Sequence, residues 1–319
     1  MCGPCKRVAT GAAVTIGGGA LVFAVAAWRS MRLPGEAEDA LALVCIFFAA
    51  LITTLVYIPE IRHPSDPNHR RVVRALYLVV LLSAIVAIMG SVGGGIIRRW
   101  ITVEATVLTQ PHSPWWEPLF AGWLLGFLAC LPEPEFHRRL PMLKYTLDSI
   151  DAWVMGAFAA AGAIVGARWR PWGDYSDIPF VELFWAMAFA GLTGAGGGLV
   201  ARVFASLTFT YRGPRGVLDD VRNWAFTDYT KIGFGVGTFT FIAYWLIGRL
   251  VPLRVIPADV FKSESVDPTV LLADLSHPGS ILHATWAKAL VGTDLGIILL
   301  LYFVFGFGAC YMYRTATTP

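Results

Sequence analysis

The chain is 319 residues long, with 56% hydrophobic and only 15% charged residues, and its formal net charge is +3. Soluble domains carry about 25% charged residues, so this composition excludes an ordinary water-soluble protein and an intrinsically disordered one. The small net charge and the lack of a basic stripe give no indication of a nucleic-acid partner. We therefore predict an all-α integral membrane protein.

Eight apolar segments follow one another along the chain, each long enough, or nearly so, to cross a bilayer as a helix. They cover approximately residues 11–28, 40–58, 75–97, 115–131, 148–167, 180–200, 232–250 and 291–313. The first follows Lys6-Arg7 in the manner of a secretory signal, but we expect it to be retained as an extra helix. The connection at 201–231, with its Asp219-Asp220 pair, is expected to be a solvated cytoplasmic loop.

Lysine and arginine in the connections predict the orientation of the chain. One side carries 15 of these residues and the other side carries 10. Both termini are therefore expected on the cytoplasmic side of a bacterial inner membrane or an organelle membrane.

Two glycine triplets indicate an internal repeat. Gly93–Gly95 and Gly196–Gly198 lie 103 residues apart, and each triplet is followed four residues later by an arginine, Arg99 or Arg202. Because an odd number of segments separates them, the two halves are expected to be inverted, as in many channels and transporters. The predicted organisation is an extra helix (1–35), two three-helix repeats (36–135 and 136–250), an extramembrane cap (251–290) and a closing helix (291–319).

Three consecutive glycines favour a break in a membrane helix, which exposes backbone groups to a cavity or pore. The alternative is that glycine lets two helices pack closely. For Asp151 near the start of the fifth segment, a cation vestibule and simple helix capping both remain open. The candidate pore residues are Gly93, Gly94, Gly95, Gly196, Gly197, Gly198 and Thr193, with Arg98, Arg99, Arg202 and Asp151 setting the electrostatic field.

No residue pattern predicts an enzyme, a metal site or a cofactor. Cys2 and Cys5 spell a thioredoxin-type motif, but they lack its strand–helix context and are interpreted as a flexible tail. The six histidines all lie in connections, so no span centre offers a ligand for haem.

The second half of the chain carries further motifs around its triplet. Leu147-Asp148-Ser149-Ile150-Asp151 opens the fifth segment, and Thr193-Gly194-Ala195-Gly196-Gly197-Gly198 closes the sixth. These motifs resemble the bacterial relatives of the trimeric intracellular cation channels, a superfamily that also contains proteins described as glycine transporters. The match is best over 147–204. The resemblance implies two inverted three-helix repeats and a seventh helix, arranged as a homotrimer with one pore in each subunit.

Some positions depart from the family pattern. In the family, the third and fourth residues after the triplet are an Arg-Asp pair. In this chain, Arg98-Arg99 follows the first triplet and Ala201-Arg202 follows the second, so neither copy has the aspartate and the second also lacks the arginine at its usual position. The leading functional hypothesis is passage of a monovalent cation, with potassium as the expected ion. The alternatives are a non-transporting structural subunit of a larger membrane complex and a carrier for a small amino acid such as glycine. Membrane lipids and a homotrimer, or a larger complex, are the expected partners.

Overall fold

The computed structural model is helical in nearly all of the residues that it describes, which are 17–22, 24–25, 40–62, 76–102, 115–133, 140–169, 179–210 and 213–242. Seven α-helices have their bounds here: α2 (Ala40–Arg62), α4 (Leu76–Ile101), α5 (Trp116–Ala129), α7 (Pro141–Arg168), α8 (Pro179–Thr208), α9 (Gly213–Asn223) and α10 (Thr230–Ile232). Two π-helical stretches, η4 (Trp224–Tyr229) and η5 (Gly233–Gly237), flank α10. The expected cap at 251–290 and closing helix at 291–319 lie outside the described residues.

Three of these helices are long and apolar enough to span a membrane: Leu43–Arg62, Tyr77–Ile101 and Phe180–Thr208. The prediction of an all-helical chain with membrane-length helices is confirmed to that extent. α5 is different, because its 14 residues make a helix only about 21 Å long, shorter than a hydrocarbon core of about 30 Å. Pro132, which lacks a backbone N–H, follows soon after this helix ends.

Two expectations about helix boundaries are wrong. α4 and α8 both continue without a break through their glycine triplets. The connection expected at 201–231 is almost entirely helical, since α8 runs on to Thr208 and α9, η4 and the start of α10 occupy most of the remainder. The 30 residues from 213 to 242 therefore form one continuous helical stretch beside α8.

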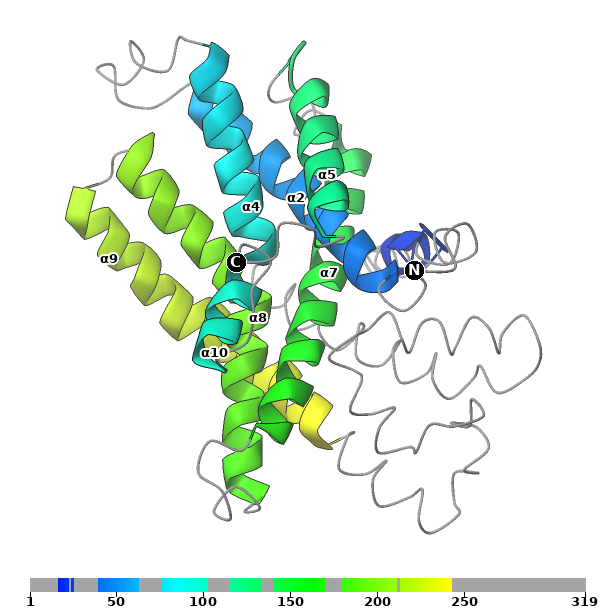
Figure 1. Cartoon of the computed structure of the whole chain (residues 1–319), viewed down its shortest axis with the longest axis vertical. Coiled ribbons are helices and arrows are strands. Elements are labelled where there is room, and N and C mark those ends of the chain that lie inside the picture. The colour runs from blue at the N-terminus through cyan, green and yellow to red at the C-terminus, as the bar shows by residue number, and fades with distance from the viewer. Residues whose placement is uncertain are drawn as a thin grey trace, which may run out of the picture.

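α8 is the central helix of the described part, with contacts to α4, α7, α9 and η5, while α2 contacts α4, α5 and α7. α4 and α8 cross near the middle of the molecule (Figure 1). Val79 and Val86 from the first half of α4 pack with Ala201 and Ala205 near the end of α8 and with Phe209 just after it. The two crossing helices are therefore antiparallel.

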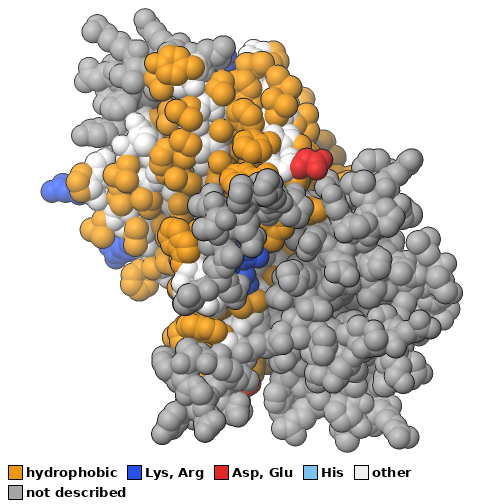
Figure 2. All heavy atoms as spheres, viewed as in Figure 1, with side chains coloured by type: hydrophobic (Ala, Val, Ile, Leu, Met, Phe, Trp, Pro, Cys, Tyr) orange, Lys and Arg blue, Asp and Glu red, His pale blue; other side chains and the backbone are white. Residues whose placement is uncertain are grey.

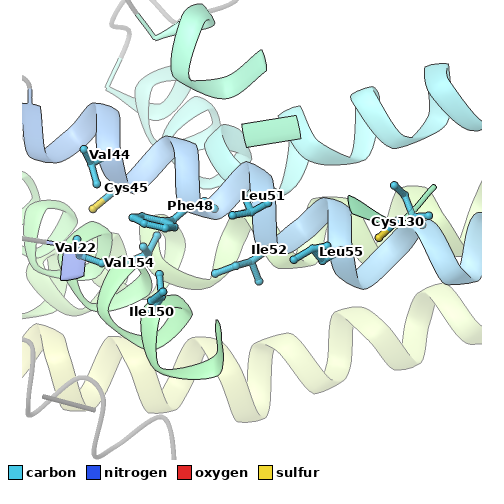
Figure 3. Close-up of a cluster of buried hydrophobic side chains, with 12 residues drawn as sticks. Val22, Val44, Cys45, Phe48, Leu51, Ile52, Leu55, Cys130, Ile150 and Val154 are labelled. Carbon is cyan, nitrogen blue, oxygen red and sulfur yellow. The ribbon is translucent and has the colours of Figure 1, made fainter. Parts of the chain in front are cut away.

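Apolar side chains fill the contact between α2 and α7. Phe48 and Ile52 of α2 lie beside Ile150 and Val154 of α7, and the same cluster extends along α2 to Cys130 at the end of α5 (Figure 3). This packing holds the two halves of the described chain together on the side of α2.

Large apolar side chains also cover much of the outer surface. Figure 2 shows a face that is dominated by hydrophobic side chains and carries few charged ones. A surface dominated by apolar side chains fits one that faces lipid. Large apolar side chains are exposed on several helices, including Leu81 on α4, Phe120, Leu124, Leu125 and Leu128 on α5, and Phe180, Phe184 and Leu207 on α8.

Candidate functional site

A cavity of about 260 Å³ lies within the bundle, between α2, α4, α7, α8 and η4. It is large enough for several water molecules or one small solute, because a water molecule occupies about 30 Å³ in the liquid. A hollow with convergent polar groups among apolar helices is the first place to look for a binding or transport site. Its polar lining consists of Thr53, Tyr57, Ser91, Asp151, Thr193, Arg202 and Asp228.

The cavity brings together some of the predicted pore residues and leaves others outside. Those that line it are Asp151, Thr193, Gly197, Gly198 and Arg202. Those that are not part of its lining are Gly93, Gly94, Gly95, Gly196, Arg98 and Arg99. Two glycines of the second triplet thus line the cavity, whereas the first triplet lies outside its lining.

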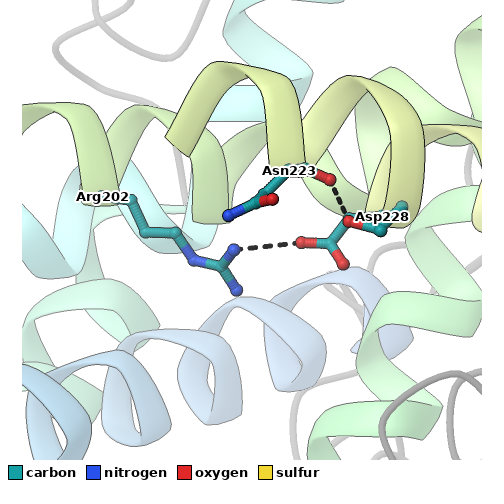
Figure 4. Close-up of polar contacts among 4 residues, drawn as sticks. Arg202, Asn223 and Asp228 are labelled. Carbon is teal, nitrogen blue, oxygen red and sulfur yellow. Dashed lines mark hydrogen bonds and ion pairs between the residues drawn. The ribbon is translucent and has the colours of Figure 1, made fainter. Parts of the chain in front are cut away.

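Arg202 meets an acidic partner in the cavity. Its Nη1 donates to Asp228 Oδ2 at 3.1 Å, and the two side chains are 48% and 34% exposed (Figure 4). Asp228 belongs to η4, where the Thr227 hydroxyl donates to the carbonyl of Asn223. π-Helical turns within longer helices are frequent at functional sites, and this one carries a cavity-lining carboxylate.

Asp151 is the second carboxylate of the cavity. It lies on α7, one turn after the exposed Asp148. Among the described residues, no ion pair to Asp151 is formed. Arg202 and Asp228 are paired to each other, so Asp151 is the cavity-lining carboxylate that lies outside this ion pair.

Thr193 lies where α7, α8 and the cavity meet. Its Oγ1 is buried and has no hydrogen-bond partner within the described part of the chain. It packs against Gly162 of α7, where a Cβ atom would collide with the Thr193 side chain. A hydroxyl in this position has unused hydrogen-bonding capacity at the edge of the cavity.

The two glycine triplets pack against each other where α4 crosses α8. A Cβ atom on Gly94 would lie 2.5 Å from the Leu192 carbonyl oxygen and 2.9 Å from that of Thr193. A Cβ atom on Gly197 would collide with the Gly90 carbonyl oxygen. The second sequence interpretation, close helix packing, therefore describes Gly94 and Gly197.

Arg98 and Arg99 lie toward the end of α4. Arg98 is only 9% exposed. The Arg99 guanidinium lies over the Trp115 ring, 4.6 Å from its centroid, which is a cation–π contact. Of the three arginines predicted to set the field of a pore, Arg202 alone belongs to the cavity lining.

Asp228 and Tyr57 are cavity residues that the sequence interpretation missed. Asp228 fell within an expected loop, so its position on a helix was not considered. Val217, Val221 and Trp224 recur at helical spacing, and this pattern indicates a helix entering the region. Tyr57 carried no comparable signal, because an aromatic residue near the end of an apolar segment is common.

The chain has no match among protein families, curated proteins or solved structures. The function is therefore inferred from the geometry and the lining residues of the cavity.

Proposed function

We propose that the chain is a multi-pass membrane protein that passes a monovalent cation, potassium, through this cavity. The observation that supports the proposal is the Asp151 carboxylate, which has no cationic partner among the described residues and lines a cavity with the hydroxyls of Thr53, Ser91 and Thr193. Hydroxyl and carbonyl oxygens can replace the hydration shell of a cation, and a fixed carboxylate favours its entry.

The proposal includes two inverted halves related through the α4–α8 crossing. α4 and α8 begin 103 residues apart, the same spacing as the glycine triplets. With this spacing, Gly94 of α4 corresponds to Gly197 of α8, and Gly90 corresponds to Thr193. The contacts match this correspondence: Gly94 lies close to Thr193, and Gly197 lies close to Gly90. Such reciprocal contacts are what a two-fold relation between the halves requires. Transporters of this kind place their site at the interface of the repeats.

Potassium flux into liposomes tests the function. We expect the purified chain to carry potassium down a gradient, and Asp151→Asn to lower the flux about tenfold because the cavity loses a carboxylate that can attract a cation. Asp219→Asn is the control, since Asp219 is exposed and outside the cavity lining. We expect it to conduct like the wild type. Folded protein with no flux above that of empty vesicles would reject the proposal and favour a structural subunit.

A carrier for a small zwitterion such as glycine is the second candidate. The cavity holds both a guanidinium, Arg202, and a separate carboxylate, Asp151, and a zwitterion needs one charge of each sign. Saturable uptake of labelled glycine, competed by unlabelled glycine and independent of a potassium gradient, would favour this function over a channel.

A further inference from the structure

The cavity lining includes both exposed and deeply buried side chains. Those of Arg202 and Asp228 are 48% and 34% exposed, whereas Ser91 is only 7% exposed. The exposed pair therefore lies at the mouth of the cavity, and Ser91 lies in its interior. A solute that enters through this mouth passes Arg202 before it reaches Ser91.

Arg202 has partners on two other elements at the mouth. Its guanidinium donates to Asp228 of η4 at 3.1 Å and also to the hydroxyl of Tyr57 on α2. Figure 4 shows the arginine side chain extending from α8 toward Asp228. The Tyr57 ring is itself in edge-to-face contact with Phe209, with 6.3 Å between the ring centroids. Arg202 thus links α8 to both α2 and η4.

The surroundings of this link are acidic. Glu60 of α2 and Asp220 of α9 are close enough to act electrostatically on Tyr57, as does Arg202 itself. A guanidinium stays charged at any physiological pH. Neighbouring carboxylates attract it, so they favour the position in which it bridges Tyr57 and Asp228.

We propose that Arg202 is a gate of the cavity, closed while Tyr57 and Asp228 hold its side chain at the mouth and open when these contacts break. This inference rests on the proposed function, because it specifies how an ion is admitted to the same cavity. The gate contacts come from α2, α8 and η4, so a change in how these elements pack would also change access to the cavity.

The arginine side chain has room to leave this position. Gly198, one turn earlier on α8, also lines the cavity, and a Cβ atom there would meet no atom within 4 Å. Ion pairs as exposed as Arg202–Asp228 are weak, and exposed side chains change rotamer rapidly. The gate can therefore open without unfolding of the bundle.

Access to the interior of the cavity can be measured without any ion flux. Ser91→Cys replaces the interior hydroxyl by a thiol, and methyl methanethiosulfonate is a small neutral reagent for it. We compare its rate of modification, in the full chain in detergent, with and without Tyr57→Phe or Asp228→Asn. Both substitutions nearly keep the shape of the side chain, so a faster reaction reports a released arginine rather than a wider mouth. Mass spectrometry of the separate peptides distinguishes residue 91 from the five native cysteines.

We expect Tyr57→Phe and Asp228→Asn each to raise the rate at residue 91 by about threefold or more, because each weakens the closed position. Tyr145→Phe is the matched control, since Tyr145 is exposed on α7 and outside the cavity lining. It should leave the rate unchanged. Cys45, buried on α2 and also outside the lining, is the internal reference, and its rate should be the same in every chain.

Two results would overturn the inference. A rate at residue 91 that neither substitution raises would show that Arg202 does not close the cavity. An equal increase at Cys45 would show that the substitutions loosen the whole bundle. Faster modification of residue 91 alone, in a protein without potassium flux, would reject the channel function and leave the gate supported. Flux without any change at residue 91 would reject the gate and leave the channel function standing.

Discussion

Asp220 is held inside the bundle by a short hydrogen bond from a neighbouring helix. Ser206 Oγ on α8 donates to Asp220 Oδ2 on α9 at 2.6 Å, and both side chains are buried. The expectation that Asp219 and Asp220 form a solvated pair is therefore wrong for Asp220, although Asp219 is exposed. Acidic residues are rarely buried without a partner, and here the partner is 14 residues earlier in the chain.

We expect Ser206→Ala to lower the free energy of unfolding by about 1.5–3 kcal/mol, because a buried carboxylate loses a hydrogen-bond donor. Asp219→Asn, on the same helix as Asp220 but exposed, should change it by less than about 0.5 kcal/mol. Unfolding in detergent, followed by circular dichroism, measures both variants. Equal losses would show that the hydrogen bond from Ser206 does not stabilise the contact between α8 and α9.

At the scale of the elements, glycine decides how closely the helices approach. Gly122 and Gly126 of α5 lie against the backbone of α2, and Gly162 and Gly166 of α7 lie against that of α8. Each pair has the four-residue spacing of close helix contacts in membrane proteins. The sequence interpretation weighed this packing as the alternative for the triplets alone. The recurrence of the same spacing in other segments was the signal that favoured it.

Each triplet contains one glycine that lies against the backbone of the other helix, Gly94 or Gly197, followed by one whose added Cβ atom would meet no atom within 4 Å, Gly95 or Gly198. Gly94→Ala and Gly197→Ala place a methyl group against backbone oxygens of the other helix, so we expect each to destabilise the protein by about 1–3 kcal/mol. Gly95→Ala and Gly198→Ala meet nothing within 4 Å and should be neutral or stabilising by up to about 1 kcal/mol, since alanine favours the helix.

Thermal unfolding of the four single variants in one detergent checks this contrast. If all four lost stability equally, the triplets would have a role other than close packing. If the variants of Gly94 and Gly197 kept full stability, the α4–α8 crossing would not depend on glycine.

At the scale of the whole molecule, contacts between helix ends define two sides of the bundle. Arg62 Nη1, at the end of α2, donates to the Cys130 carbonyl oxygen at 2.9 Å, at the end of α5. Ile61 of α2 also packs in one cluster with Phe209, just after α8. The ends of α2, α5 and α8 are therefore together. The end of α4 meets the start of α5 on the other side, through Arg99 and Trp115.

This arrangement predicts the sidedness of single cysteines in membrane vesicles. Residues 133 and 210 lie on the side that the lysine and arginine count predicts to be cytoplasmic, and residue 102 lies on the opposite side. The three variants are Glu133→Cys, Thr210→Cys and Thr102→Cys. We expect a membrane-impermeant thiol reagent added outside right-side-out vesicles to label the Thr102→Cys variant alone, and the other two variants only after permeabilisation. Labelling of the Thr102→Cys and Glu133→Cys variants from the same side would contradict the predicted topology.

The sequence by itself determined the helical class, three of the membrane-length helices and the 103-residue spacing of the triplets. These properties depend on composition and on short-range pattern, since an apolar stretch that must satisfy its own backbone forms a helix. The tertiary structure decided that Gly94 and Gly197 pack rather than break their helices, because the carbonyls that they approach belong to another helix. It also decided that Arg202 pairs with Asp228, which lies 26 residues later in the chain. Such a pairing across helices depends on how they cross, which local sequence does not encode.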